Sequence, residues 1–251
     1  MTTKVINELS IQISLNGLSF CIKSAHTNTI TYCNSILFEN KLTPFETLNR
    51  LKTELSSNSI FSNDFNKVGV IYHNELSTLV PQSLYDEAHN AEYLKFNSKI
   101  LKTDFIATDT IEASEAVNVY IPYVNINNYI FETFGAFTYR HSATVFIASI
   151  DGLDKDTTCA YINIENSTMQ IVVKDNDNII FYNYFEFGSK EDFIYYILFS
   201  FEQLELDVEH TELKMCGTIE KEDELYNMAY KYVRHVSLLD EHTNFIIKNS
   251  F

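Results

Sequence analysis

The sequence predicts an α/β protein in which one supersecondary unit occurs twice. Residues Thr157 to Ile219 predict three successive strands, a long helix with an apolar face and a fourth strand. The first part of the chain predicts the same order of elements in a weaker form. The chain has 251 residues, of which 45 % are hydrophobic, so it is long enough for two lobes that each bury a core. We therefore expect a duplicated α/β protein.

The first unit begins with three strands. Strict alternation of apolar and polar residues predicts a half-buried strand over Leu9–Leu15. Asn16-Gly17 then predicts a type I′ hairpin turn, because both central residues of that turn need a positive φ. Leu18–Lys23 and Thr29–Phe38 are expected to return as the second and third strands.

The four cysteines lie in apolar, strand-like segments without the spacing of a metal site. A hairpin that turns near Thr27 would place Cys21 and Cys33 opposite each other on neighbouring strands. We expect these two cysteines to be close in space and reduced, as buried thiols usually are in a cytoplasmic protein.

The clearest helix start in the chain follows the third strand. Thr43 is expected to cap the helix, Pro44 suits the first helical position, and Glu46 completes a capping box. The apolar positions at helical spacing predict the buried face. They are Phe45, Leu48, Leu51 and Leu55.

The middle of the chain predicts an inserted subdomain over about residues 67–116. Its expected elements are strands over Val68–Tyr72, Ser77–Val80 and Phe105–Ile111 and a helix over Ser83–Phe96. After it, the first lobe is expected to resume with a strand at Val117–Ile121, a helix at Asn127–Phe134 ended by Gly135 and a strand at Phe137–Tyr139. Ser142–Ile150 is expected to form a helix, although Val145–Ile147 would also suit a strand.

Asp151–Thr157 is polar and carries a glycine, so it predicts a linker between lobes of residues 1–150 and 151–251. The second lobe is expected to contain strands over Cys159–Ile164, Met169–Val173, Ile179–Phe187, Leu213–Cys216 and His235–Leu238. Ser189 is expected to cap a helix between the third and fourth of these strands, and Thr218 to cap a last helix.

The net charge of −16 argues against a nucleic-acid surface, because phosphate contacts need clustered Lys and Arg. No signal peptide and no apolar run of membrane-spanning length is apparent. We expect a cytoplasmic protein without direct membrane insertion.

The duplicated order of elements resembles the actin/sugar-kinase/heat-shock-ATPase superfamily, whose actin-like ATPase fold has two ribonuclease-H-like lobes around a central cleft. The layout is similar to the cytoplasmic actin-like proteins of pilus assembly and type II secretion. Three segments look like an uncharacterised Bacteroidetes family with this fold and no established activity. They are Leu9–Ile22, Val117–Val124 and Tyr139–Thr144.

The resemblance implies that Leu9–Ser24 and Cys159–Lys174 are the two phosphate-binding hairpins, and each departs from the superfamily pattern. The first hairpin keeps a glycine turn, but the usual metal-holding aspartate is absent. The second has a carboxylate but no glycine after it, and the adenosine-binding loop keeps one glycine. If a nucleotide and Mg bind, the residues implied are Asn16, Gly17, Glu165, Ser167 and Gly217.

The sequence gives little support for other enzymatic activities or for a zinc site. A two-metal nuclease needs converging carboxylates, and the first strand offers none. No P-loop, nucleophile elbow or zinc-ligand spacing is present, and Ser142 is most simply a helix start rather than part of a catalytic triad.

The chain has 19 Phe and 16 Tyr but no Trp. Several of these rings fall in Phe181–Phe187, and Tyr195, Tyr196 and Phe199 lie outside the core stripe of the following helix. Either a sheet covered on both sides buries them, or they form an exposed patch that binds a protein partner or a second copy.

Two functions follow from the sequence. The first is a non-catalytic actin-like scaffold or regulatory protein, a pseudo-ATPase that needs no cofactor and acts on a protein partner or by self-association. The alternative is a weak ATP binder or slow ATPase that uses the interlobe cleft.

Overall fold

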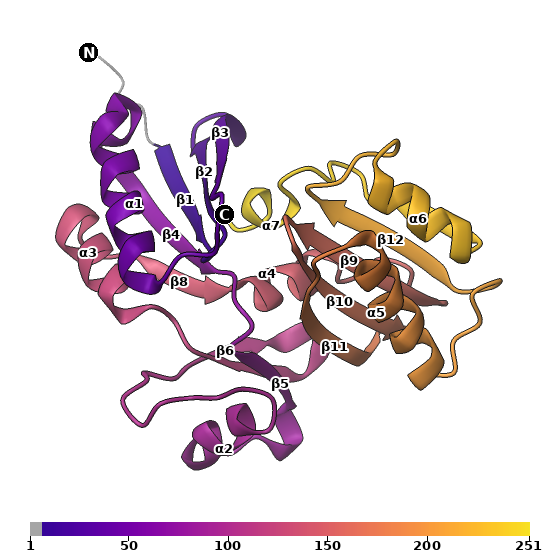
Figure 1. Ribbon diagram of the computed structural model, residues 1–251. Coiled ribbons are helices and arrows are strands. Elements are labelled where there is room, and N and C mark those ends of the chain that lie inside the picture. Colours follow the sequence, from indigo (N-terminus) through magenta and orange to yellow (C-terminus); the bar gives the residue numbers. More distant parts are fainter. Residues whose placement is uncertain (1–6) are drawn as a thin grey trace. The chain divides into compact units, whose positions relative to one another are not determined.

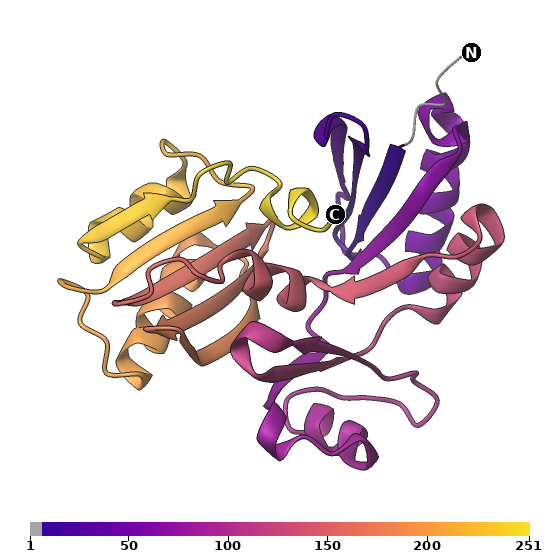
Figure 2. The ribbon, with the colours of Figure 1, turned by 180° about the vertical axis from the view of Figure 1, so that it is seen from behind.

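A computed structural model describes residues 7–251 (Figures 1 and 2). The chain divides into two compact units. Of the described residues, the first contains 7–110, Val117–Val145 and Ile247–Phe251, and the second contains Ile111–Ala116 and Phe146–Ile246. The boundary near residue 150 between two separate domains stays a prediction.

The first unit is built on a five-stranded sheet in the order β3-β2-β1-β4-β8. Its strands are β1 (Asn7–Ile13), β2 (Gly17–Ser24), β3 (Thr29–Leu37), β4 (Phe65–Tyr72) and β8 (Thr138–His141). β1 and β2, and β2 and β3, pair antiparallel, whereas β4 pairs parallel with both β1 and β8.

The second unit repeats this sheet in the order β11-β10-β9-β12-β13. Its strands are β9 (Thr158–Glu165), β10 (Thr168–Asp175), β11 (Asn178–Glu186), β12 (Glu212–Gly217) and β13 (His235–Leu238). β11 and β10, and β10 and β9, pair antiparallel, whereas β12 pairs parallel with both β9 and β13. The expected duplication of an α/β unit is therefore confirmed.

Each sheet carries two helices on one face, and that face holds the core. α1 (Pro44–Ser57) and α3 (Val124–Phe134) cover the first sheet. α5 (Lys190–Gln203) and α6 (Glu224–Tyr232) cover the second. Apolar residues at every second position of the strands pack against these helices.

The capping box of α1 is present as predicted. The Thr43 side chain accepts a hydrogen bond from the Glu46 amide, and the Glu46 carboxylate accepts one from the Thr43 amide. Leu48, Leu51 and Leu55 are buried. The expectation that Phe45 is buried is wrong, because Phe45, in the first turn of the helix, is 68 % exposed.

The segment between β4 and β8 contains a three-stranded sheet in the order β5-β7-β6. Its strands are β5 (Ser77–Pro81), β6 (Ala107–Ile111) and β7 (Ala116–Tyr120). Two strand assignments are corrected here. β4 was expected to open the insertion but lies in the first sheet, and β7 was expected in the core sheet but lies in this smaller one. The near-continuous apolar run of β4 is typical of a parallel strand buried on both faces.

The helix expected over Ser83–Phe96 is mostly wrong. Short 3-10 turns at Gln82–Leu84 and Glu87–His89 precede α2 (Asn90–Lys95). Leu94 is fully buried, but Leu84 is 71 % exposed. The Asp86 side chain accepts from the Ala88 amide, and this local bond favours a turn over a continuous helix.

Helix starts in the second unit are predicted with mixed success. Ser189 caps α5 as expected, since its side chain accepts from the Asp192 amide. The expectation that Thr218 caps the last helix is wrong, because α6 begins only at Glu224. The Thr218 hydroxyl instead donates to the carbonyl oxygen of Ile164.

α4 (Ser142–Ser149) lies where the sequence predicts it.

The C-terminal residues belong to the first unit and follow α7 (Phe245–Lys248). The Ser250 hydroxyl lies 2.6 Å from the hydroxyl of Ser10 on β1, and both residues are buried. The Arg140 guanidinium donates to the Ser250 carbonyl oxygen. The end of the chain therefore contributes packing to the first sheet.

Cys21 and Cys33 are direct register partners on β2 and β3, as expected. The expectation that they are reduced is wrong for this structure, in which they form a disulfide. Direct pairing on antiparallel strands brings the Cα atoms to 4.2 Å and the two sulfur atoms together. Cys159 and Cys216 are free and buried.

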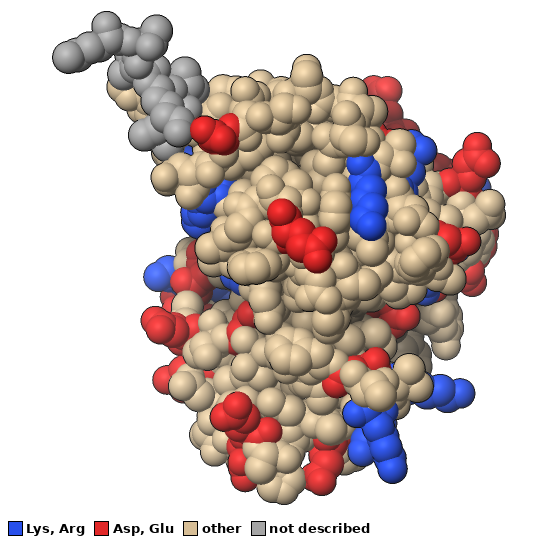
Figure 3. Space-filling model, turned by 90° about the vertical axis from the view of Figure 1, so that its left-hand side faces the viewer, with Lys and Arg blue, Asp and Glu red and all other residues tan. Residues whose placement is uncertain are grey.

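The surface that carries α1 and α3 has Lys, Arg, Asp and Glu scattered among uncharged residues (Figure 3). The basic side chains on this face are not gathered into one patch. In the described part of the chain, no helix has the length and apolar character to cross a membrane.

Candidate functional site

The first expected phosphate hairpin joins β1 and β2, and its turn is closed internally. Ile13 and Leu18 are the last paired residues, and the Ser14 amide donates to the Gly17 carbonyl at 3.0 Å. The Asn16 amide donates to the Ser14 hydroxyl at 3.0 Å. Neither Asn16 nor Gly17 has a positive φ, so the predicted type I′ turn is wrong. Two backbone amides of this turn are used within the turn itself.

Gly17 has a packing reason to be glycine. A Cβ atom at this position would lie 2.6 Å from the carbonyl oxygen of Ile36 on β3, closer than real Cβ contacts allow. The neighbouring Asn16 carbonyl accepts from the Phe38 amide at 2.9 Å. The close approach of β3 therefore explains the glycine without a ligand.

The second expected hairpin joins β9 and β10 and is also internally bonded. Asn166 has a φ of 57°, and its amide donates to the Thr218 hydroxyl at 3.1 Å. The Thr168 hydroxyl donates to the Glu165 carbonyl at 2.8 Å, and the Ser167 carbonyl accepts from the Phe187 amide at 2.8 Å. The turn is tied to its own unit on both sides.

Gly217 ends β12 beside this hairpin. Its φ is 98°, and an added Cβ atom would lie 1.9 Å from the Ile164 carbonyl oxygen. The Gly217 amide donates to the His242 carbonyl at 2.8 Å, and the Thr218 amide donates to the Ile164 carbonyl at 2.7 Å. The structure thus brings Gly217 next to the hairpin that holds Glu165 and Ser167. Asn16 and Gly17 lie in the other unit.

Two buried amide residues lie on the strand faces opposite the core, close to the two hairpins. Ile11 and Ile13 of β1 point into the core, so Gln12 is the last residue of β1 on the opposite face. In β9, Ile162 and Ile164 point into the core, so Asn163 corresponds to Gln12, and Glu165, the last residue of β9, follows it on the same face. Strand alternation places Gln12 on the polar face of β1 from the sequence alone, and the same rule applied to β9 gives Asn163.

Gln12 and Asn163 are both buried neutral amides. Gln12 is 5 % exposed and Asn163 is 0 % exposed. The side-chain Oδ1 atom of Asn163 accepts a weak hydrogen bond from the Cys216 thiol at 3.6 Å. Within residues 7–251, neither the Gln12 Oε1 atom nor the Asn163 Nδ2 atom has a hydrogen-bond partner. Mg²⁺ is usually held by carboxylates, and an amide in each position removes the negative charge that would attract it.

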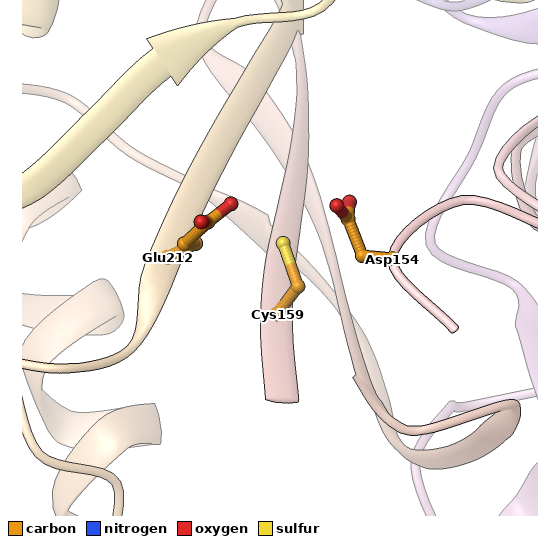
Figure 4. Close-up of side chains that lie close together, drawn as sticks. All are labelled: Asp154, Cys159 and Glu212. Carbon is orange, nitrogen blue, oxygen red and sulfur yellow. The ribbon is translucent and has the colours of Figure 1, made fainter. Parts of the chain in front are cut away.

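A separate group of potential metal ligands lies on the second sheet (Figure 4). Asp154, Cys159 and Glu212 come from a loop and two neighbouring strands, and their ligand atoms lie within 4.8 Å of one another. The Lys214 ammonium is 2.7 Å from both Asp154 oxygens and 3.2 Å from Glu212. The Tyr161 hydroxyl donates to Asp154 at 2.5 Å. The carboxylates are therefore already compensated.

The protonation states of this group also disfavour a metal. Burial alone would raise the pKa of Asp154, but hydrogen bonds from Lys214 and Tyr161 outweigh it and lower the pKa. Burial raises the pKa of the Cys159 thiol to about 12, and nearby Asp154 adds to the shift. A protonated thiol is a poor metal ligand. The residues present fit an ion pair better than a metal centre.

A buried polar network lies at the ends of β4 and β8 in the first unit. His73 Nδ1 lies 3.0 Å from the Ser142 hydroxyl, and His141 Nε2 lies 3.1 Å from the Asn74 carbonyl. The His141 amide donates to the Asp109 carboxylate at 2.9 Å. Burial lowers the pKa of His73 to about 4. The pKa of His141 is lowered to about 3, by burial and then by His73.

This network is not arranged for hydrolysis. Ser142, His141 and His73 are 0 %, 0 % and 2 % exposed, so a substrate cannot reach the serine hydroxyl. Ser142 begins α4, which is the role that the sequence suggests. The network joins the ends of two strands to the first turn of a helix.

Comparison with known proteins gives a family match and a fold match. The model of the DUF3822 family, described as a protein of unknown function, matches residues 2–236. No curated protein matches the sequence.

Three solved structures are similar to this chain. A protein of Bacteroides thetaiotaomicron with an actin-like ATPase fold and unknown function superposes with a TM-score of 0.86 and 19 % identity over 98 % of this chain and 95 % of that one. The PilM-PilN type IV pilus biogenesis complex gives a TM-score of 0.63 and 12 % identity over 94 % and 89 %. The cytoplasmic domain of EpsL, an inner membrane component of the type II secretion system of Vibrio cholerae, gives 0.46 and 8 % over 94 % and 87 %.

The first two similarities confirm the actin-like ATPase fold that the sequence resemblance implied. The identities are too low to transfer an activity. The comparisons therefore establish the fold and the family and leave the function to be argued from the residues.

Proposed function

The chain belongs to the DUF3822 family of proteins of unknown function, and we propose that it is a non-catalytic scaffold or regulatory protein with degenerate phosphate-binding hairpins. In this proposal the chain needs no nucleotide or metal and acts through contacts with other proteins. We further propose that it works in the cytoplasm, without binding nucleic acid or inserting into a membrane.

One observation carries the proposal: the same two changes occur in both units. The strand residue that would face a metal ion is a buried amide, Gln12 in one unit and Asn163 in the other. The hairpin amides of Asn16 and Asn166 donate to side chains of their own unit. A phosphate ligand would have to replace these bonds, and a metal ion would find a neutral amide at residues 12 and 163. Glu165, the last residue of β9, is a carboxylate at the strand end, and it belongs to the alternative considered below.

Exposed aromatic rings support an interaction role. On α5, Tyr195 is 58 % exposed and Phe199 is 43 % exposed. Tyr196 is partly buried and stacks on Phe185 of β11, with ring centroids 4.6 Å apart. The two explanations for the aromatic content therefore each apply to part of it, and the exposed part favours binding to another protein.

The fold neighbours give weaker support for the same role. PilM was solved as part of a complex with PilN. A chain with this fold can therefore take part in a protein assembly, and we extend that possibility to this chain as part of the proposal.

The alternative is weak ATP binding or slow hydrolysis with Mg. Its residues remain Asn16, Gly17, Glu165, Ser167 and Gly217. Its support is that Glu165 and Ser167 share a hairpin and that Gly217 lies next to it, as in an intact second phosphate site.

An ATP hydrolysis assay tests the proposal. We expect phosphate release from ATP and Mg²⁺ to stay at the rate of the protein-free control. Release above that rate that is lost in Glu165→Gln, but kept in the exposed control Glu186→Gln, would overturn the proposal in favour of the alternative.

A further inference from the structure

α5 presents two aromatic rings at the centre of its solvent face. Phe193, Ile197 and Phe201 of this helix point into the core of the second unit. Tyr195 and Phe199 lie on the opposite side and are exposed, and they are one helical turn apart. Large rings at the outermost positions of a helix contribute little to the core, so their placement needs another explanation.

The exposed rings are part of a continuous chain of ring contacts. Tyr195 and Phe199 stack with centroids 5.8 Å apart. Tyr195 also contacts Tyr196 edge-to-face at 5.6 Å, and Tyr196 stacks on Phe185 of β11. These contacts restrict the rotamers of the two exposed rings, which lowers the entropy lost when a partner covers them. We call Tyr195 and Phe199, with the acids described next, the α5 face.

Acidic residues stand at both ends of the α5 face. Glu191 precedes Tyr195 by one turn and Glu202 follows Phe199 by about one turn, and both are exposed. The two acids are about three turns, or about 16 Å, apart along the same side of the helix. The only basic residue of α5 is Lys190, whose ammonium pairs with Glu224 of α6. The face is therefore apolar in the middle and negative at each end.

We propose that the α5 face docks an amphipathic helix of another protein that carries Lys or Arg about three turns apart, with apolar residues between them. This proposal rests on the proposed function, because it names the kind of partner through which a scaffold would act. Charge complementarity places one basic residue near Glu191 and the other near Glu202. A guanidinium that approaches either acid can also lie over the adjacent ring.

The same charges argue against a second copy of this chain as the occupant. In a two-fold antiparallel contact between α5 helices, Glu191 would lie beside Glu202 of the other copy at each end. Like charges would meet twice in one small interface, in a chain whose net charge is already −16. A basic partner avoids both repulsions.

A model peptide provides the probe. It has about 16 residues, with Leu in its two central turns, Arg about three turns apart and one Trp outside the apolar stripe. The protein has no Trp, so anisotropy of the peptide Trp reports binding without background from the protein. A peptide of the same composition, shuffled so that the Leu residues lose helical spacing, separates docking from general attraction to an acidic protein.

Three variants of the full chain complete the experiment. The double variant Tyr195→Ser/Phe199→Ser removes the rings, and Glu191→Gln/Glu202→Gln removes the charges. Phe131→Ser is the matched control, because Phe131 is 62 % exposed on α3 of the first unit. All the changed side chains are exposed, so the variants are expected to fold, and the melting temperature checks this.

We expect saturable binding of the probe to the wild type and to Phe131→Ser. Loss of the rings should weaken binding about tenfold or more. Loss of the acids should weaken it and reduce its dependence on salt. The proposal falls if the shuffled peptide binds equally well, if the ring variant binds like the wild type, or if the wild type binds no peptide.

Sedimentation of the same samples tests the second-copy alternative. A wild-type dimer that the ring substitution converts to a monomer would overturn the proposal in favour of self-association. The proposed function is judged separately: failure of the peptide leaves it standing, whereas ATP hydrolysis would overturn it whatever the peptide does.

Discussion

A Cβ atom placed on Gly217 would lie 1.9 Å from the carbonyl oxygen of Ile164. The end of β12 can therefore approach β9 only if residue 217 is glycine. The glycine of the expected adenosine-binding loop has a structural purpose within one unit. Its presence alone does not indicate a nucleotide.

Gly217→Ala should lower the free energy of unfolding by about 3 kcal/mol or more, because it combines a backbone clash with an unfavourable positive φ. Gly152→Ala is the matched control. Gly152 also has a positive φ, but its Cβ would meet only the end of the Lys155 side chain at 3.6 Å. The control should lose about 1 kcal/mol in urea unfolding. Equal losses of unfolding free energy in the two variants would show that residue 217 does not approach Ile164 closely.

Asn163→Asp should destabilise the second unit at neutral pH, because it places a carboxylate in a fully buried position. We expect a loss of a few kcal/mol that shrinks as the pH falls and the carboxyl becomes protonated. Asn183→Asp, on the exposed side of β11, is the control and should be close to neutral. Recovery of the Asn163→Asp stability with Mg-ATP would mean that the site still accepts a metal nucleotide.

The buried histidines should make the protein sensitive to mild acid. Both have folded pKa values below the ordinary 6.5, about 4 for His73 and about 3 for His141. The unfolded chain therefore binds protons first, and stability is complete above about pH 6.5 and falls as the pH drops toward these values. Each unit of depressed pKa corresponds to about 1.4 kcal/mol.

Urea unfolding at about pH 7 and about pH 5 measures this loss. His141→Gln should reduce the difference between the two conditions, and the exposed control His89→Gln should leave it unchanged. A protein that is equally stable at both values, with neither variant altering the difference, would contradict the neutral, buried state of His73 and His141.

Lys214 and Asp154 should be energetically coupled. Lys214→Met leaves the Asp154 carboxylate without its main partner, and Asp154→Asn leaves the ammonium beside Glu212 alone. The double variant should lose less stability than the sum of the two single variants, by about 1 kcal/mol or more in a double-mutant cycle. Additive losses would indicate that solvent, rather than Asp154, compensates the ammonium.

Local sequence signals predicted those elements whose determinants lie within a few residues. The capping box of Thr43 and Glu46 is such a case, since both partners are in the first turn of one helix. The Ser189 cap is another. The duplicated strand order also followed from the repeated pattern of apolar segments, and this part of the fold was correct.

Local signals did not predict elements whose residues contact partners far away in the sequence. Thr218 has the chemistry of a helix cap, but it accepts from Asn166 and donates to Ile164, so α6 begins later. Asn16-Gly17 has the composition of a type I′ turn, but β3 packs against Gly17 through Ile36, and the turn takes another form. In both places tertiary contacts decide the conformation.

The candidate site was predicted only in outline. The two hairpins lie where the sequence predicts them, between β1 and β2 and between β9 and β10, whereas their role in phosphate binding stays a prediction. Alternation placed Gln12 on the polar face of the first strand, but Asn163 was not singled out, because it lies within an apolar strand. The exposure of Tyr195 and Phe199 was left open because a helix next to an edge strand can bury or expose such rings, and only the packing of α5 decides.

The most direct test of the account is thermal unfolding of the wild-type protein with and without millimolar Mg-ATP. A nucleotide present at about a hundred times its dissociation constant would stabilise the fold by about 2.7 kcal/mol. We predict no shift of the melting temperature, because the hairpin amides of Asn16 and Asn166 already have partners in their own units and residues 12 and 163 are neutral amides. A shift of several degrees that depends on both Mg²⁺ and ATP, and is lost in Glu165→Gln, would contradict the account and establish a nucleotide site.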